Sequence, residues 1–247
     1  MKQIILLTIL LCTAFLLNAQ MSGKVSYTET IKMKFEMDLP DGIDLSGMIP
    51  ESQSFNKELL FDQGKAIYRD SKTNENTDQE FTSDDGSLQI KFETTNEEDI
   101  LFTDLKEKKS VHKRDLMGKA FLVEDIIKKT KWKLTGEKLK YLGYECQKAI
   151  STDGEKEIIA WFTPQIPVQH GPSSFNQLPG MVLMITTADQ SMEIKATEIV
   201  LGSEFSEDIK MPTKGKKVSN EEFIEISEEK MKEMQEMMGG EGFIIKN

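Results

Sequence analysis

Residues 161–185, WFTPQIPVQHGPSSFNQLPGMVLMI, indicate the fold most directly, because a proline-rich segment separates two apolar runs. Trp161 and Phe162 end the first run, and Met181 begins the second. Four of the chain's seven prolines lie between the runs, and each fixes a φ angle and removes a backbone donor. The pattern predicts two strands joined by a stiff connector that is held in one shape.

The end of this connector has the chemistry of a tight turn. Pro179 presets φ at one central position, and Gly180 permits φ > 0 at the next, as a type II turn requires. Leu178 and Met181 on either side would then be anchored in the apolar layer. We therefore expect Leu178, Pro179, Gly180 and Met181 to form a structural turn.

The same residues resemble the motif of the GLPGLI family of secreted bacterial proteins. Leu178-Pro179-Gly180 match it, Met181 and Val182 are apolar replacements, and Gln177 stands where the family has its first glycine. That departure suggests that position 177 does not need φ > 0. The pattern Gly-Tyr-x-Cys-x-Lys-Ala at residues 143–149 is also similar. The resemblance implies secretion and a mostly β domain, and it implies no reaction.

Outside the connector, alternation of apolar and polar residues predicts an antiparallel sheet. Residues 24–37 alternate almost perfectly, which is typical of a strand with one wet face. Asp62-Gln63-Gly64 is expected to turn a hairpin, and the polar residues 70–87 are expected to form a loop. The other expected strands are 58–61, 65–69, 88–92, 100–105, 110–114, 119–123, 131–135, 145–152, 157–162, 181–187 and 193–201.

The two ends of the chain differ from this pattern. Residues 1–19 combine Lys2, an apolar run and a small-residue cut site, which predicts a secretory signal peptide and a periplasmic or secreted protein. Residues 20–218 are expected to form one antiparallel β domain. Residues 219–247 are expected to form an amphipathic helix, capped by Ser219, with a short tail packed on or beside the domain. No apolar run in the mature part is long enough to span a membrane.

The expected fold class is therefore mainly β with a C-terminal helix: a single, curved antiparallel sheet or half-barrel. The analogy is to periplasmic lipoprotein carriers, whose concave sheet is covered by helices and a flap. This is an analogy of architecture, and architecture alone does not determine function.

Few residues in the sequence suggest a catalytic or ligand-binding role. His112 and His170 lack partners at metal-site spacing, so the sequence predicts no metal and no cofactor. A triad of His170 with Ser173 or Ser174 lacks a nucleophile-elbow motif. Removal of the signal peptide would leave Cys146 as a lone thiol, and its apolar neighbours favour burial. The methionines near the C-terminus are expected to pack rather than bind copper. Trp132, Trp161 and Phe162 are expected in the core or at a pocket rim.

The charge composition of the chain argues against one class of binding partner. A net charge of −11 argues against nucleic acid, which requires concentrated Lys and Arg. The sequence therefore favours an exported, non-enzymatic binding protein of the cell envelope that holds an apolar ligand or a partner segment in a concave sheet. An envelope protein–protein interaction module is the alternative, and a hydrolase is third. The oligomeric state is left open.

Overall fold

The computed structural model describes residues 21–32, 35–36, 52–71, 79–82, 89–92, 99–152, 154, 156–202, 205–237 and 244–245. The expected signal peptide lies outside the described residues. Side chains are not described for the short strands at 35–36, 79–82, 89–92 and 244–245, nor at 234, 235 and 237.

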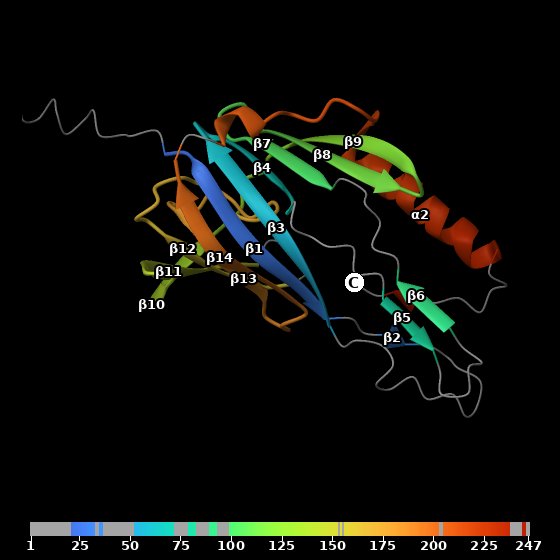
Figure 1. Cartoon of the computed structure of the whole chain (residues 1–247), viewed down its shortest axis with the longest axis horizontal. Helices are drawn as coiled ribbons and strands as arrows, with labels where there is room; N and C mark the ends of the chain where they lie inside the picture. Colours follow the sequence, from blue (N-terminus) through green and yellow to red (C-terminus); the bar gives the residue numbers. More distant parts are fainter. Residues whose placement is uncertain are drawn as a thin grey trace, which may run out of the picture.

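Most of the described chain forms one open, curved sheet of twelve strands, in the order β10-β11-β12-β13-β14-β1-β3-β4-β7-β8-β9-β15 (Figure 1). The strands of this sheet are β1 (Gly23–Lys32), β3 (Ser52–Asp62), β4 (Lys65–Asp70), β7 (Ile100–Asp104), β8 (Lys109–Leu116), β9 (Lys119–Ile126), β10 (Lys133–Tyr141), β11 (Tyr144–Ser151), β12 (Ile158–Thr163), β13 (Met181–Thr187), β14 (Met192–Leu201) and β15 (Lys216–Ser219). The expected mainly β class and curved antiparallel sheet are confirmed, with β15 against β9 as a parallel pair.

Four short strands lie outside the large sheet. They pair as β2 (Phe35–Glu36) with β16 (Ile244–Ile245), and as β5 (Gln79–Thr82) with β6 (Gln89–Phe92). The expected loop at 70–87 is therefore wrong in part, because β5 lies inside it. Phe81 is the only apolar residue among residues 79–82, which is too few for an alternating pattern, and it pairs with Ile90 of β6.

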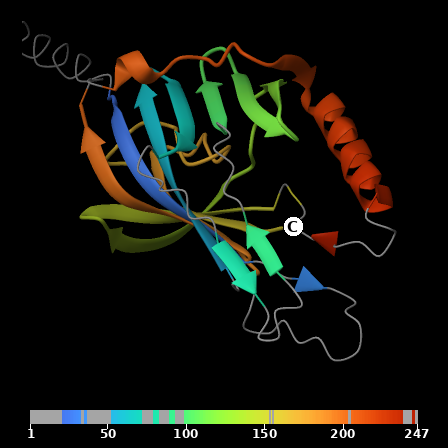
Figure 2. The ribbon, with the colours of Figure 1, turned by 45° about the vertical axis from the view of Figure 1, so that its right-hand side comes forward.

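Three irregularities in the strand pairing help to bend the sheet. They lie between Ser26 and Tyr27, between Leu134 and Lys138, and between Trp161 and Phe162. Such bulges increase local twist and turn a strand away from its partner. Figure 2 shows the resulting curvature, with the strands β10 and β11 running across the direction of β3 and β4.

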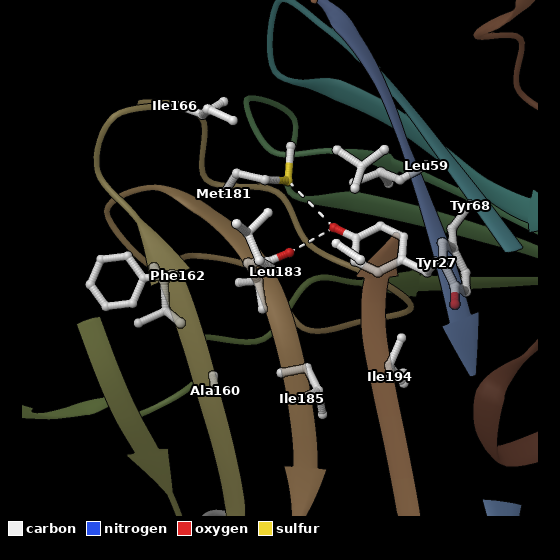
Figure 3. Close-up of a cluster of buried hydrophobic side chains, with 14 of the residues drawn as sticks. Tyr27, Leu59, Tyr68, Ala160, Phe162, Ile166, Met181, Leu183, Ile185 and Ile194 are labelled. Carbon is white, nitrogen blue, oxygen red and sulfur yellow. Dashed lines mark hydrogen bonds between the residues drawn. The ribbon is translucent and has the colours of Figure 1, made fainter. Parts of the chain in front are cut away.

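The main core lies on the inner face of this curved sheet. It brings residues of the central strands together with residues of β11–β14 and of the connector, residues 164–180. Tyr27, Leu59, Phe162, Ile166 and Leu183 are at most 2% exposed. The concave face at this end is therefore filled by the chain's own side chains, as Figure 3 shows.

Helix α2 (Asn220–Met237) begins directly after β15. Ser219 and Glu222 form a capping box: Glu222 N donates to Ser219 Oγ at 3.1 Å, and Ser219 N donates to Glu222 Oε2 at 2.8 Å. Phe223 packs edge-on against Phe121 with ring centroids 5.5 Å apart, and Arg114 lies 4.7 Å from the Phe223 ring. The helix is thereby held beside β9.

The helix does not bury all its methionines, since Met231 is 54% exposed. The expectation that the methionine stripe packs on the sheet therefore fails at this position. A short 3-10 helix, η1 (Ser206–Asp208), lies before β15. Within the described residues, neither helix has the length and apolar character needed to cross a bilayer.

Candidate functional site

The connector is fixed to the sheet by backbone and side-chain hydrogen bonds. Met181 N donates to Ile166 O at 2.9 Å, and Val182 N donates to His170 O at 3.0 Å. Tyr27 Oη donates to Val182 O at 2.6 Å and contacts Met181 Sδ at 3.7 Å (Figure 3). Ile166 is fully buried. The connector is therefore a packed part of the inner face rather than an open loop.

The turn expected at Leu178-Pro179-Gly180 has a different geometry from the type II form. Gly180 N donates to Leu178 O at 2.8 Å, which closes a three-residue γ-turn centred on Pro179. A Cβ on Gly180 would lie 2.2 Å from Thr163 O and 2.6 Å from Thr163 C. Glycine is needed here because the end of β12 passes directly against the turn.

The inference about Gln177 is also corrected. Gln177 has φ = 69°, in the left-handed region, so this position does use the conformation that glycine adopts most readily. Its Nε2 donates to Lys128 O at 2.8 Å. Trp132 Nε1 donates to Asn176 O at 2.9 Å. These two bonds tie the connector to the segment that leads into β10.

The three residues expected in the core or at a pocket rim all pack against the main core. Phe162 is fully buried, while Trp132 and Trp161 are partly buried against the same cluster. Cys146 is fully buried on β11, and burial raises the pKa of its thiol to about 11. In the structure these residues therefore lie in the main core or pack against it.

His170 lies inside the connector and not in a catalytic arrangement. It is only 2% exposed, and its Nε2 has no hydrogen-bond partner. Burial lowers the pKa of His170 to about 4, although the charge of Asp104 acts in the opposite direction. An imidazole that stays neutral and is closed to water is a poor match for the general base of a serine triad.

A different group of side chains has the polar character of a functional site. We call it the inner-face cluster, and it consists of Glu29, Lys57, Tyr68, Asp70, Asp99 and His112. Strand register explains how they meet: Tyr27 pairs with Lys57 and Lys57 with Asp70, while Leu59 pairs with Tyr68. Directly opposed residues of paired strands point to the same face. Five segments of the chain therefore contribute to one polar group beside the apolar core.

The contacts within the cluster form a connected network. Lys57 Nζ lies 3.0 Å from Asp70 Oδ1 and 3.6 Å from Asp99 Oδ2. His112 Nε2 is hydrogen-bonded to Asp99 Oδ1. Tyr68 Oη donates to Glu29 Oε2 at 3.1 Å. The Lys57 side chain is 11% exposed and the Asp99 side chain 50% exposed, so the network runs from the buried sheet surface to solvent.

The surroundings shift the pKa values of the two end carboxyl groups in opposite directions. Burial raises the pKa of Glu29, and Lys57 and the Tyr68 hydroxyl offset only part of this effect. Partial shielding from water would raise the pKa of Asp99, but the hydrogen bond and charge of His112, with Lys57 and Arg114, hold it below its ordinary value. Glu29 therefore accepts a proton more readily than a free glutamate, and Asp99 stays ionised.

This arrangement suits proton transfer and recognition of a polar ligand. A pair of carboxyl groups whose pKa values are displaced in opposite directions supplies a proton donor and a proton acceptor at one pH. Among the described residues, no set of three or more His, Cys, Asp or Glu side chains could hold a metal ion. The residues of the cluster therefore offer acid–base chemistry.

No motif or spacing in the sequence pointed to this cluster. Its members are spread from residue 29 to residue 112, and acidic residues are too common in this chain, at 42 Asp and Glu, for any pair to stand out. A weak signal was available in the polar residues at inward positions of alternating strands, such as Glu29 in β1. An inward charge on a half-buried strand requires partners.

Comparison with known proteins gives both a family and a fold. A family described as "N-glycanase peptide, N-terminal domain" matches residues 54–232, which is well over half of the chain. Solved structures of PNGF-II share the fold. The P21 crystal form has a TM-score of 0.51 and 16% identity over 81% of this chain. The C2 form has a TM-score of 0.53 and 15% identity over 84% of this chain. No curated protein matches the chain.

These findings overturn two expectations from the sequence. The resemblance to the GLPGLI family is wrong: it rested mainly on short motifs in and around one packed connector, whereas the N-glycanase family matches a long continuous segment. The expectation of a non-enzymatic envelope binding protein is also wrong, because the description of the matching family names an N-glycanase. This chain belongs to the family of N-glycanase peptide N-terminal domains.

Proposed function

We propose that this chain takes part in the hydrolytic removal of N-linked glycans from peptides, and that its inner-face cluster meets the substrate. The family match over residues 54–232 is the observation that carries the proposal. Five of the six cluster residues lie inside the matched segment, and Glu29 joins them from β1. The hydrolase that ranked third from sequence thus becomes the favoured class.

The extent of the match limits what is carried over. The chain spans 32% of the length of each of the two solved PNGF-II chains. At 15–16% identity, the likeness supports the fold and not the roles of individual residues. The proposed site is therefore defined by this chain's own side chains.

The cluster has groups that suit a glycosylated peptide. Sugar hydroxyls both donate and accept hydrogen bonds, and carboxylates, a phenol hydroxyl and an imidazole offer complementary partners. Asp99, Asp70 and His112 keep exposed side-chain fractions of 50%, 39% and 31%, so a ligand from solvent can reach them. The buried Lys57 and Tyr68 hold this accessible edge in place.

Export from the cytoplasm is part of the proposal. Residues 1–19 have the composition of a secretory signal peptide. A protein that acts on glycosylated peptides outside the cell requires such a signal. N-terminal sequencing of the protein recovered from periplasmic and secreted fractions would test it, and an intact Met1 there would contradict it.

The function is tested with a defined N-glycosylated peptide and the purified protein. Mass spectrometry would follow release of the glycan and conversion of the freed asparagine to aspartate. A binding measurement would compare the glycopeptide with the same peptide lacking the glycan. We expect glycan release and tighter binding of the glycopeptide. A folded protein that neither releases the glycan nor prefers the glycosylated form would overturn the proposal.

A further inference from the structure

We propose that the edge of the sheet at β10 is a docking surface for a membrane whose lipids carry anionic headgroups. The surface consists of residues 128–140, which we call the cationic strip, and of Leu142 at the tip of the β10–β11 hairpin. In the sheet order, β11 to β14 separate β10 from β1, so this surface is distinct from the inner-face cluster. The inference goes beyond the proposed function and does not depend on it.

The cationic strip has a charge opposite to that of the whole chain. It contains six lysines and one glutamate, in a protein whose net charge is −11. The lysines are Lys128, Lys129, Lys131, Lys133, Lys138 and Lys140, and all six are exposed. The glutamate, Glu137, accepts hydrogen bonds from Lys148 Nζ at 2.9 and 3.1 Å, so a lysine of β11 already matches its charge. The positive charge of the strip is therefore not compensated within the strip.

Five of these lysines have no carboxylate partner within the part of the chain that the structure describes. They are Lys128, Lys129, Lys133, Lys138 and Lys140. Glu145 of β11 stands opposite Lys140, so the uncompensated charge is greatest at the start of the strip. Anionic headgroups attract clustered lysines to a membrane surface. Lysines without acidic partners keep this attraction in full.

The start of the strip is held in a fixed position. Gln177 Nε2 donates to Lys128 O at 2.8 Å, and Trp132 Nε1 donates to Asn176 O at 2.9 Å. From Lys133 onward the strip belongs to β10, which is the last strand at its end of the sheet. At the usual rise per residue, β10 extends for about 25 Å. An extended, positively charged edge of this length can lie along a flat surface.

Two exposed leucines accompany the lysines. Leu134 follows Lys133 and is 52% exposed, and Leu142 is 43% exposed. Leu142 and Gly143 have φ angles of 48° and 87°, so they form the two-residue loop of the hairpin, where Asn and Gly are the usual residues. Apolar side chains beside lysines suit a lipid interface, because the apolar groups enter the boundary between headgroups and acyl chains. The leucines therefore favour a lipid surface over a soluble polyanion.

The acidic helix α2 lies far from β10 (Figure 1). Its sequence has seven glutamates and two lysines, and Phe223 packs it against Phe121 of β9. The strand order places β9 near one end of the sheet and β10 at the other. Charges of opposite sign at two ends orient a protein in the field of an anionic surface, with the positive end toward that surface. This separation turns β10 toward the membrane despite the negative charge of the whole chain.

The first test measures binding of the full chain to lipid vesicles by cosedimentation. The vesicles contain phosphatidylcholine alone or phosphatidylcholine mixed with phosphatidylglycerol, and we expect binding to the anionic vesicles that weakens as salt is raised. The strip variant combines Lys128→Gln, Lys129→Gln and Lys133→Gln. Its Kd should rise about 10²-fold, because each lysine close to an anionic surface contributes about fivefold to the affinity.

The matched control makes the same charge change at three exposed lysines outside the strip. It combines Lys210→Gln, Lys214→Gln and Lys216→Gln. This control should bind the anionic vesicles like the parent. All the proteins keep the same N-terminus, so differences between them report the substituted lysines.

A second pair of variants tests the hairpin tip. Leu142→Asn removes the apolar side chain, and asparagine tolerates positive φ, so the turn is preserved. Its Kd for anionic vesicles should rise about tenfold, because a leucine that enters the lipid contributes at least this much. Met117→Asn is the control: Met117 has φ = 53° and is 51% exposed at the tip of the β8–β9 hairpin, outside the strip. This control should bind like the parent.

The membrane proposal is overturned by any of three results. The first is a failure to bind anionic vesicles more tightly than vesicles of phosphatidylcholine alone. The second is parental binding by the strip variant. The third is parental binding by Leu142→Asn, in which case strip-dependent binding of soluble polyphosphate would identify the ligand as a free polyanion. Far-UV circular dichroism shows that each variant is folded.

Discussion

Tyr27 of β1 donates a 2.6 Å hydrogen bond to the backbone carbonyl of Val182 in β13, across a strand that separates them in the sheet. The order β13-β14-β1 means that this bond is made over the concave face and not along the strand ladder. The Tyr27 ring is also in edge contact with Tyr68, at 6.2 Å between centroids. One side chain thus links the start of β13, the apolar core and the inner-face cluster.

Replacing Tyr27 by phenylalanine should weaken the fold. The change leaves the buried carbonyl of Val182 without this donor, and loss of a buried hydrogen-bond partner costs about 1–3 kcal/mol. Urea denaturation followed by tryptophan fluorescence measures the free energy of unfolding. Tyr144→Phe, on β11 at a half-buried position, is the control and should stay close to the parent. Equal stability of Tyr27→Phe and the parent would show that the bond across β14 contributes nothing.

Replacing Gly180 by alanine tests the close approach of the turn to β12. The added Cβ would fall 2.2 Å from Thr163 O, so backbone must move, at a cost of about 1–3 kcal/mol. Gly154→Ala is the matched control, because a Cβ there meets nothing within 4 Å. A melting temperature several degrees below that of the control is expected. Identical melting of the two variants would contradict the packed turn.

Replacing Gln177 tests the left-handed backbone at the start of the motif. Gln177→Gly relieves the cost of φ = 69° but loses the bond to Lys128 O, so we expect a melting temperature near that of the parent. Gln177→Val also loses the bond and places a β-branched side chain at positive φ, which should cost about 1–3 kcal/mol. Differential scanning calorimetry compares the two. A valine variant as stable as the glycine variant would argue against a left-handed residue 177.

Local chemistry made part of this fold predictable. The hairpin at Asp62-Gln63-Gly64 is set by its turn residues, and β3 and β4 pair across it as expected. The start of α2 is determined by its capping box, so the helix cap expected at Ser219 is confirmed. These elements are determined by residues a few positions apart. Alternation and turn chemistry report such short-range constraints well.

The pairing of strands that lie far apart in the sequence could not be predicted in this way. β14 pairs with β1, which joins residues such as Tyr27 and Ala196, and β15 returns to run parallel to β9. No periodicity states which strands become neighbours, so the sequence could not bring Glu29, Lys57 and Asp99 together. The inner-face cluster follows from strand order. Its members each satisfy a local pattern, and their proximity arises only from the complete sheet.

The motif at residues 177–182 shows why the family was misread. The Leu-Pro-Gly turn is determined by local geometry: a side chain at Gly180 would collide with the end of β12, and Pro179 is the central residue of the γ-turn. The same local geometry can arise in unrelated sheets, so a match at this turn carries little information about common ancestry. A family match over residues 54–232 depends on many positions at once. Agreement over a long segment therefore outweighs agreement at a few short motifs.

The stability of the protein should fall on acidification because of His170. Burial lowers its pKa in the folded state from 6.5 to about 4, so between these values the unfolded chain binds the proton and the folded chain does not. The unfolded state is then favoured as pH falls through this window, by about 3 kcal/mol in total. We expect His170→Gln to lose less stability than the parent when urea denaturation is compared at about pH 7.5 and about pH 4. Taking the difference between the two proteins cancels the titration of the carboxyl groups that both share. If the parent and His170→Gln lose the same stability on acidification, the buried imidazole does not control the acid response of the connector.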